Sequence, residues 1–366
     1  MIKGTIQGMI KADIVIIGAG MAGASLGWAL RQRGADVLLL EAEDTPGYHT
    51  TGRSAAFWVA SYGGPTIAPL TLASRDFLMQ PPEGFGQILS PRSGLYLAPP
   101  EDAEALARLA TDMDEGGVNY QRLGPDELAR FAMLRPEWRR AGILEPESYD
   151  IDVAALHQGY LRGAKLRTRA PVTAAEKVGD FWRVQAGGAC VEARVVVNAA
   201  GAWADPVGVI FGCAAKGLVP LRRTMVVLRT DPEPDADMPV VLDAGGHFYF
   251  KPEAGRVWLS PHDETPDAAH DVQADEMDVA VVIDRFERAT NFRVLKVERR
   301  WAGLRTFAPD RRPVLGWDAV PGVFWCAGQG GFGIQTAPAV ADLCARVLEG
   351  ETGKRDIGIY AASRFL

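Results

Sequence analysis

The sequence predicts a mixed α/β fold, and three observations support this prediction. A glycine-rich turn at 18–23 lies between a β-branched run and a helical pattern, as in α/β domains. Alternating apolar and polar residues at Leu221–Leu228, Pro239–Phe250 and Arg256–Ser260 predict antiparallel strands. The chain has 366 residues, which allows two domains or one elaborated domain.

The first predicted unit is a strand, a turn, a helix and a second strand. Asp13–Ile17 is a short apolar strand, and the glycine turn that follows it leads into a helix that ends near Arg33 and Gly34. Asp36–Leu40 is the next buried strand, and Glu41 follows it directly. This order is the dinucleotide-binding arrangement.

Each glycine of that turn has a distinct expected task. Gly18 permits the tight turn, Gly20 lets backbone amides approach a pyrophosphate, and Gly23 lets the helix pack closely on the strand. Glu41 is expected to accept hydrogen bonds from ribose hydroxyls. A purely structural glycine turn is disfavoured because both strands, the helix and the acid are in register. The motif alone does not separate NAD from FAD.

Three later segments favour a longer cofactor. Gly47–Ala56 is rich in small and hydroxyl side chains, which suits a stretch that lies along an extended ligand. Asn198–Asp205 follows a buried strand and contains a glycine. Ala327–Thr336 is glycine-rich and precedes a helix that is predicted to reach about Glu349. The free amides and positive dipole at the start of that helix suit an electron-rich group such as the pyrimidine edge of a flavin.

Composition excludes several classes of function. The net charge is −7 and arginine is scattered, which disfavours nucleic acid as the main partner. The four cysteines lack a C-x-x-C pair, and the histidines at 157, 247, 262 and 270 lack ligand spacing, so no metal is expected. The run at Met1–Lys11 is too short for a secretory signal and no apolar run could span a membrane, so we expect a cytoplasmic protein. Loose attachment to a membrane surface stays open.

Seven motifs across nearly the whole chain resemble one enzyme family. They are GYHTTGRSAA (47–56), DIDVAALHQGYLRGA (150–164), VVNAAGAWAD (196–205), FYFKPEAG (248–255), AHDVQADEMDVA (269–280), WAGLRTFAPD (301–310) and GGFGIQT (330–336). Together they resemble the D-amino acid oxidase superfamily of FAD-dependent flavoproteins. Within it, the chain looks most similar to the bacterial D-arginine dehydrogenases.

The resemblance implies an interleaved architecture with a Rossmann-like FAD-binding domain. That domain would comprise residues 1–80, 151–215 and 301–366. Residues 81–150 and 216–300 would form a substrate-binding domain on an antiparallel sheet. Some relatives attach the flavin through a cysteine in the segment that matches Gly303–Ala308, and none occurs here, so non-covalent FAD is expected.

The resemblance also assigns residues to the cofactor and to the substrate. The expected FAD-binding residues are Gly18, Ala19, Gly20, Met21, Ala22, Gly23, Glu41, Ala42, His49, Thr50, Thr51, Arg53, Ser54, Val172, Ala200, Gly201, Trp203, Gly330, Gly331, Gly333, Ile334, Gln335 and Thr336. The expected catalytic residues are His49, Gln87, Arg223, Tyr249, Arg305, Gly331 and Gln335.

The resemblance also implies the roles of these catalytic residues. Arg305 and Arg223 would hold a carboxylate, since a guanidinium can bond both of its oxygens, although Arg222 is an alternative to Arg223. Tyr249 would close the pocket over the substrate, and His49 would lie near the substrate amine. Gly331 and Gln335 would lie near the amino group and the flavin.

The implied reaction is oxidative deamination of a D-amino acid. A hydride passes from the α carbon to flavin N5, and the imino acid hydrolyses to a 2-oxo acid and ammonia. Gln87 stands where the D-arginine dehydrogenases carry a glutamate for the substrate guanidinium, and Val240 and Leu242 accompany Tyr249. A preference for neutral or apolar side chains over D-Arg is therefore expected, unless Glu83 reaches the guanidinium instead.

Other functions remain to be separated. A sarcosine-type secondary-amine oxidase or a 2-hydroxy-acid oxidase would use the same fold and the same arginines. An RNA-modifying flavoprotein is disfavoured by the acidic charge. A non-catalytic flavin carrier and an NAD-dependent dehydrogenase stay open. The electron acceptor (quinone, electron carrier or oxygen), the oligomeric state and the group that takes the ammonium proton do not follow from the sequence.

Overall fold

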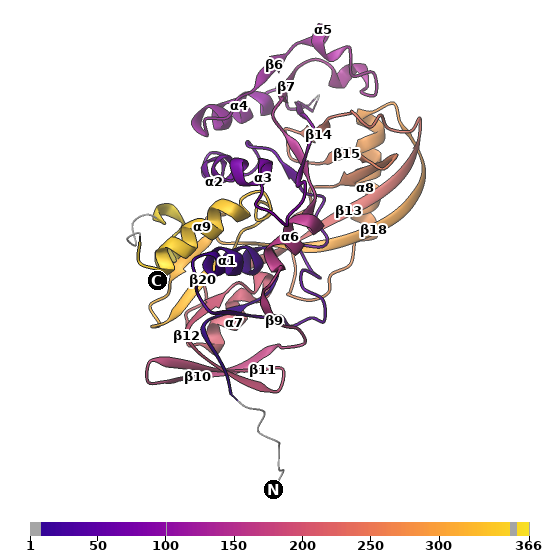
Figure 1. Cartoon of the computed structure of the whole chain (residues 1–366). Helices are drawn as coiled ribbons and strands as arrows, with labels where there is room; N and C mark the ends of the chain where they lie inside the picture. Colours follow the sequence, from indigo (N-terminus) through magenta and orange to yellow (C-terminus); the bar gives the residue numbers. More distant parts are fainter. Residues whose placement is uncertain (1–8, 100, 352–356, 366) are drawn as a thin grey trace.

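The protein has the mixed α/β fold that the sequence predicts. The structure is a computed structural model that describes residues 9–99, 101–351 and 357–365, so the expectation for Met1–Lys11 lies mostly outside it. Two large sheets organise the chain. In Figure 1, the first sheet lies below helices α1 and α9, and the long strands β13 and β18 curve along the second sheet.

The first sheet carries the predicted dinucleotide unit. Strands β1, β2, β9, β12 and β20 pair in parallel, while β10–β11–β12 and β19–β20 are antiparallel. Parallel strands place their carboxyl ends at one edge, where ligands of α/β folds bind. The order is β10 (Val172–Val178), β11 (Phe181–Ala186), β12 (Ala189–Asn198), β1 (Ile10–Ile17), β2 (Val37–Leu40) and β9 (Lys165–Arg167), with β20 (Val323–Ala327) on β12 and β19 (Val314–Trp317) on β20.

The second sheet is mostly antiparallel. Its order is β17 (Thr265–Pro266), β13 (Val219–Asp231), β16 (Arg256–Ser260), β15 (Tyr249–Glu253), β14 (Val240–Asp243), β5 (Gly94–Leu97), β7 (Gly142–Glu145) and β6 (Gln121–Leu123), with β18 (Arg293–Phe307) paired to β13. The run Pro239–Phe250 was expected as one strand but forms two, because a turn at 244–248 separates β14 from β15. Strand β18 crosses the proposed domain boundary at 301.

Helices cover the sheets, and a small third sheet joins distant segments. The third sheet holds β3 (Phe57–Trp58), β8 (Tyr149–Ile151) and β4 (Leu89–Pro91). The α-helices of the described residues are α1 (Met21–Gln32), α2 (Ala68–Ala73), α3 (Arg75–Met79), α4 (Ala105–Glu115), α5 (Pro125–Leu128), α6 (Val153–Leu161), α7 (Ala204–Ile210), α8 (Glu276–Ala289) and α9 (Ala337–Leu348). No described helix is long and apolar enough to cross a membrane.

Alternation along the strands builds two cores around the first sheet. In β1, Ile14 and Ile16 face the core that α1 and α9 cover, whereas Val15 and Ile17 face the opposite core. Burial of each such side chain stabilises the fold by about 1.5–3 kcal/mol. Helix α1 ends where Gly34 adopts a φ of +89°, as the sequence predicts. All four cysteines are free, and Cys190 alone among them is not fully buried.

Candidate active site

A cavity opens where the parallel strands of the first sheet end. Its volume is about 390 Å³, and Ile17 and Gly18 of the first turn, Leu40 and Glu41, Ala199, and Ala327 all line it. Most residues of the segment 47–54 and of the glycine loop 328–334 also line it. We call this space the nucleotide cavity.

The glycine turn before α1 is shaped for close backbone approach. A Cβ atom on Gly18 would lie 2.4 Å from the Ala199 carbonyl oxygen, and one on Gly23 would lie 1.9 Å from the Gly18 carbonyl oxygen. Neither position can accept a larger residue without displacing backbone. Gly20 caps α1 and lines the cavity; the Met21 N–H donates to Thr51 Oγ1 at 3.0 Å, and the other first-turn amides of the helix, which have no intrahelical acceptor, can serve an anion.

An acid stands at the end of β2, where a ribose is expected. Glu41 lines the cavity and is 9% exposed. Its carboxylate accepts hydrogen bonds from the backbone N–H groups of Ala19 at 2.9 Å and Glu43 at 3.0 Å. These bonds fix its position while leaving further acceptor capacity, since a carboxylate can accept about four. The turn, the helix start and the acid therefore fit an FAD whose pyrophosphate lies at α1.

Eighteen of the predicted FAD residues line the nucleotide cavity, and five do not. Ala19, Gly23 and Thr336 are packed behind the wall. Arg53 donates to the carbonyls of Val272 and Ala302 at 3.1 and 3.0 Å instead. The lining set is Gly18, Gly20, Met21, Ala22, Glu41, Ala42, His49, Thr50, Thr51, Ser54, Val172, Ala200, Gly201, Trp203, Gly330, Gly331, Gly333 and Ile334.

A group of buried and half-buried polar side chains adjoins one end of this cavity. Arg305 lines the cavity, and its Nη1 donates to the Tyr62 hydroxyl at 2.7 Å. A Cβ atom on Gly331 would lie 2.8 Å from the same Nη1, so the glycine loop lies directly against the guanidinium. We call Tyr62, Arg223, Tyr249, His262 and Arg305 the arginine cluster.

Arg223 contributes a second guanidinium to the cluster. It is 4% exposed, its Nε donates to the Asp263 carbonyl at 2.8 Å, and its Nη2 donates to Glu264 at 3.2 Å. Its Nη1 is buried and has no hydrogen-bond partner among the described residues. Arg222 points the other way to Asp278 at 2.9 Å, because successive strand residues face opposite sides. The structure therefore assigns Arg223, not Arg222, to the cluster.

The two guanidiniums dominate the electrostatics of the cluster. Burial and the charge of Arg305 lower the pKa of Arg223. Burial opposes ionisation of Tyr62, but the charges of Arg305 and Arg223 outweigh it and lower the pKa of its phenol. Burial and the same two arginines hold the pKa of His262 well below its ordinary value. The cluster is thus a buried positive site with a neutral histidine, which favours an anionic ligand.

The contacts of His262 define its tautomer. Its Nδ1 lies 3.0 Å from the Gly246 carbonyl oxygen, and its Nε2 lies 3.3 Å from the Tyr62 hydroxyl. A carbonyl only accepts, so Nδ1 carries the proton and Nε2 accepts from Tyr62. The Tyr62 oxygen then accepts from Arg305 while its hydrogen points to His262.

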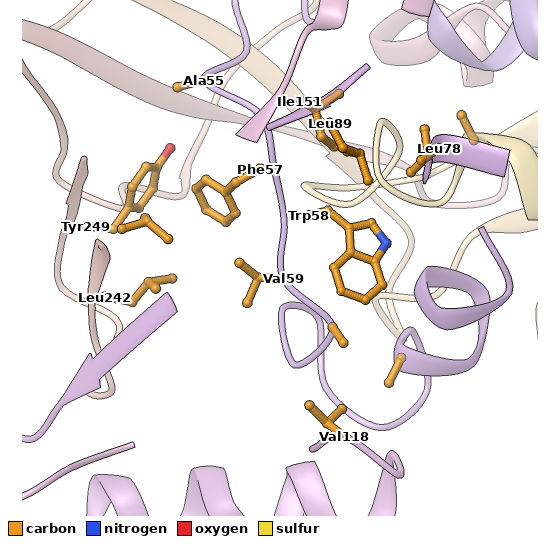
Figure 2. Packing of buried hydrophobic residues seen from close by; sticks show 14 of the residues in the cluster. Ala55, Phe57, Trp58, Val59, Leu78, Leu89, Val118, Ile151, Leu242 and Tyr249 are labelled. Atoms are coloured by element: carbon orange, nitrogen blue, oxygen red, sulfur yellow. The ribbon is translucent and has the colours of Figure 1, made fainter. Parts of the chain in front are cut away.

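Apolar side chains form the wall beside Tyr249. Leu242 pairs with Tyr249 across strands β14 and β15, and the Phe57 ring meets the Tyr249 ring edge-on at 5.5 Å. The Tyr249 hydroxyl donates to the Met225 sulfur at 3.3 Å. Figure 2 shows Phe57 and Val59 on the same side of their segment as Leu242 and Tyr249, while Trp58 points away. A ligand held by the arginines would thus meet a dry, uncharged wall on this side.

Three of the expected catalytic residues have partners within the protein. His49, expected near the substrate amine, lines the nucleotide cavity, where its Nε2 lies 2.9 Å from a Glu43 carboxylate oxygen and its ring packs on Trp203. Gln87 is exposed, and its amide donates to the Leu89 carbonyl at 3.1 Å rather than lining the cavity. Gly86, the residue before it, adopts a φ of +75° and is also exposed.

Gln335 also has a different environment from the one expected. It is 3% exposed and does not line the cavity. Its Nε2 donates to the Tyr62 carbonyl at 3.2 Å and to Thr71 Oγ1 at 2.9 Å. It therefore supports the backbone that carries Tyr62 instead of facing a ligand.

Sequence reasoning missed Tyr62 and His262. Neither lies in a recognised motif, and each reaches the cluster only through the pairing of distant strands. Gly63 and Gly64, which follow Tyr62, indicate a turn, but they do not indicate which residues that turn contacts. Among residues 9–99, 101–351 and 357–365, no group of three or more potential metal ligands gathers.

Comparison with known proteins defines the family. Residues 13–347 match the family model described as "DAO: FAD dependent oxidoreductase". Mitochondrial dimethylglycine dehydrogenase from Rattus norvegicus is 28% identical over 93% of this chain. The alignment covers 43% of that relative, so the chain spans less than half of its length.

Solved structures show the same fold. L-Proline dehydrogenase from P. horikoshii superposes with a TM-score of 0.85 at 22% identity, covering 98% of each chain. Glycine oxidase from Geobacillus kaustophilus superposes with a TM-score of 0.83 at 23% identity, covering 98% of this chain and all of the other. At such identities the likeness establishes architecture, not substrate.

Proposed function

Because the chain belongs to the DAO family of FAD-dependent oxidoreductases, we propose that it oxidises the α carbon of a D-amino acid. FAD is its cofactor, and we propose that it is held without a covalent bond, since Gly303–Ala308 contains no cysteine. The resemblance of seven motifs to the D-arginine dehydrogenases supports the D configuration. The product would be an imino acid. Water then hydrolyses this imino acid to a 2-oxo acid and ammonia.

One observation carries this proposal. The buried guanidinium of Arg223 and the half-buried one of Arg305 converge at the end of the nucleotide cavity, and Arg223 Nη1 is left without a partner among the described residues. Burial of an unpartnered charged donor is costly unless a ligand satisfies it. An amino acid offers a carboxylate, which can accept from Arg223 and Arg305 together.

The protein contributes position and exclusion of water. When bound, FAD supplies the acceptor for the hydride that leaves the substrate carbon. Arg305 and Arg223 would anchor the carboxylate. Gly331 has no side chain, so the space beside Arg305 stays open, whereas a Cβ atom there would collide with the guanidinium. Fixing one end of the substrate orients its α carbon. This lowers the activation barrier because the entropy of positioning the substrate is lost on binding and not in the chemical step.

The apolar wall supports a preference for neutral side chains. Phe57, Leu242 and Met225 surround Tyr249 and offer no charge to a substrate guanidinium. The acids that contact Arg223 are already engaged, Asp263 by Thr224 at 2.7 Å and Glu264 by Arg311 at 2.7 Å. The uncharged wall, rather than Gln87, is therefore the reason to expect that D-Arg is a weak substrate.

A second candidate is oxidation of a secondary amine. The relatives named for dimethylglycine and L-proline favour it, since both molecules carry a carboxylate and an alkylated amine. Anaerobic reduction of the FAD-loaded protein by D- and L-amino acids, sarcosine, dimethylglycine and 2-hydroxy acids separates the candidates. Flavin bleaching by neutral D-amino acids supports the proposal, whereas bleaching only by N-methylated glycines or L-proline replaces it with the second candidate.

A further inference from the structure

A buried acid contacts the segment that carries Tyr62. Glu145 ends strand β7 and is 1% exposed. Its Oε1 accepts from the Ala60 backbone N–H at 2.5 Å, and its Oε2 accepts from the Ser61 hydroxyl at 2.6 Å. Ser61 Oγ also lies 2.9 Å from the Tyr96 hydroxyl of β5. An ionised carboxylate accepts through both oxygens, and both donors face it here.

The segment is thereby held from two sides. Glu145 fixes Ala60 and Ser61, and Gln335 donates to the carbonyl of the next residue, Tyr62, at 3.2 Å. The Tyr62 hydroxyl in turn receives the hydrogen bond from Arg305 at 2.7 Å. A change in the bonds to Glu145 therefore acts on Tyr62 through one or two peptide units.

A merely structural role would not require a carboxylate. No lysine, arginine or histidine of the described residues forms an ion pair with Glu145, so only hydrogen bonds, and no opposite charge, offset the cost of burying its charge. A glutamine would accept from Ala60 and donate to Ser61 at lower cost. The groups that face the carboxyl are the Ala60 backbone N–H, Ser61 and, through Ser61, Tyr96, while Ser148 donates to the Glu145 backbone carbonyl.

We propose that Glu145 is a positioning residue whose ionised form fixes Tyr62 against Arg305 and so tightens the binding of a carboxylate in the arginine cluster. The inference rests on the proposed function of that cluster. When Glu145 is protonated it can only donate one bond and accept weakly, so Ala60 and Ser61 are held less firmly. Glu145→Gln imitates this protonated form at every pH.

Titration of Glu145 supplies the first test. Burial raises its pKa to about 7. A carboxyl whose pKa rises on folding stabilises the protein below its unfolded pKa and loses this contribution as the pH rises through its folded pKa. The melting temperature of wild type relative to Glu145→Gln should therefore fall between about pH 5 and about pH 8. A constant difference shows that Glu145 does not titrate there and overturns the proposal.

Binding of benzoate, a simple carboxylate, supplies the decisive test. Flavin absorbance of the FAD-loaded protein reports its Kd. In wild type, the Kd should fall about threefold to tenfold from about pH 6 to about pH 8, because charge-assisted bonds replace neutral ones. Glu145→Gln should give the weaker Kd at both pH values. His262 stays neutral over this range, since its pKa lies well below its ordinary value.

Two further variants separate the possible failures. Ser148→Ala perturbs the same turn but not the carboxylate, since Ser148 donates to the Glu145 backbone carbonyl, and it should retain the pH dependence. If Glu145→Gln also retains it, or Ser148→Ala loses it, the positioning role is wrong. If benzoate binds equally to wild type and Arg305→Met, or not at all, the carboxylate site itself is wrong and the inference falls with it.

Discussion

The nucleotide cavity and the arginine cluster adjoin each other but are built by opposite means. Backbone lines the cavity where glycines at 18 and 23 leave no room for a Cβ atom. The cluster consists of large charged or aromatic side chains, and Arg223 and Tyr249 are almost fully buried. One region therefore offers a ligand peptide amides and shape, and the other offers guanidinium groups.

This difference predicts which substitutions each region tolerates. A backbone site fails when a side chain is added, and it should lose FAD. A side-chain site fails when a functional group is removed, and it should lose substrate while keeping FAD. The variants below test that division, and they are ordered by expected effect.

Arg305→Met should produce the largest loss. Removal of one guanidinium from a buried carboxylate site costs about 2–5 kcal/mol in kcat/KM, mainly through a higher KM. FAD content should stay normal. Arg222→Met is the matched control on strand β13, because Arg222 faces Asp278 rather than the cluster. Near-normal kinetics for Arg305→Met would remove this residue from the site.

Gly23→Ala should break the other region. The added methyl would lie 1.9 Å from the Gly18 carbonyl oxygen, so α1 must move away from the turn. Overpacking of this kind costs about 1–3 kcal/mol in the free energy of unfolding, and FAD content of the purified protein should drop. Gly27→Ala on the same helix is the control, since its Cβ meets nothing closer than 3.4 Å. Equal FAD content in both variants would contradict this account.

Tyr62→Phe should give a smaller, selective loss. It removes one hydrogen bond from Arg305, which corresponds to about 1 kcal/mol or about fivefold in benzoate affinity. The control is Tyr160→Phe, since the Tyr160 hydroxyl is buried without a partner among the described residues. A benzoate Kd unchanged in Tyr62→Phe would show that Tyr62 does not support the carboxylate site.

Gln87→Glu should have almost no effect. Gln87 is exposed and lies outside the cavity lining, so a charge there should change the ratio of kcat/KM for D-Arg and D-Met by less than about 0.5 kcal/mol. A clear shift toward D-Arg would show that the loop around 84–88 reaches the substrate and would restore the original interpretation of this residue.

The sequence predicted the nucleotide cavity better than the arginine cluster for a physical reason. The turn at 18–23 and the acid Glu41 are close in sequence, so their spacing alone predicts how they are arranged in space. Tyr62, His262 and Arg305 meet only because β13 pairs with β18 and a separate loop folds over the sheet. Motif resemblance identified Arg305 and Arg223, but it could not show that His49 turns to Glu43 or that Gln335 turns to Tyr62.

The central claim is that the arginine cluster selects a substrate by its carboxylate. The most direct measurement compares anaerobic flavin reduction by D-methionine and by 3-(methylthio)propylamine, which is the same molecule without the carboxylate. The account predicts fast bleaching with D-methionine and a second-order rate constant lower by at least about 30-fold with the amine, since one desolvated charge pair is absent. Equal rate constants for the two compounds would contradict it.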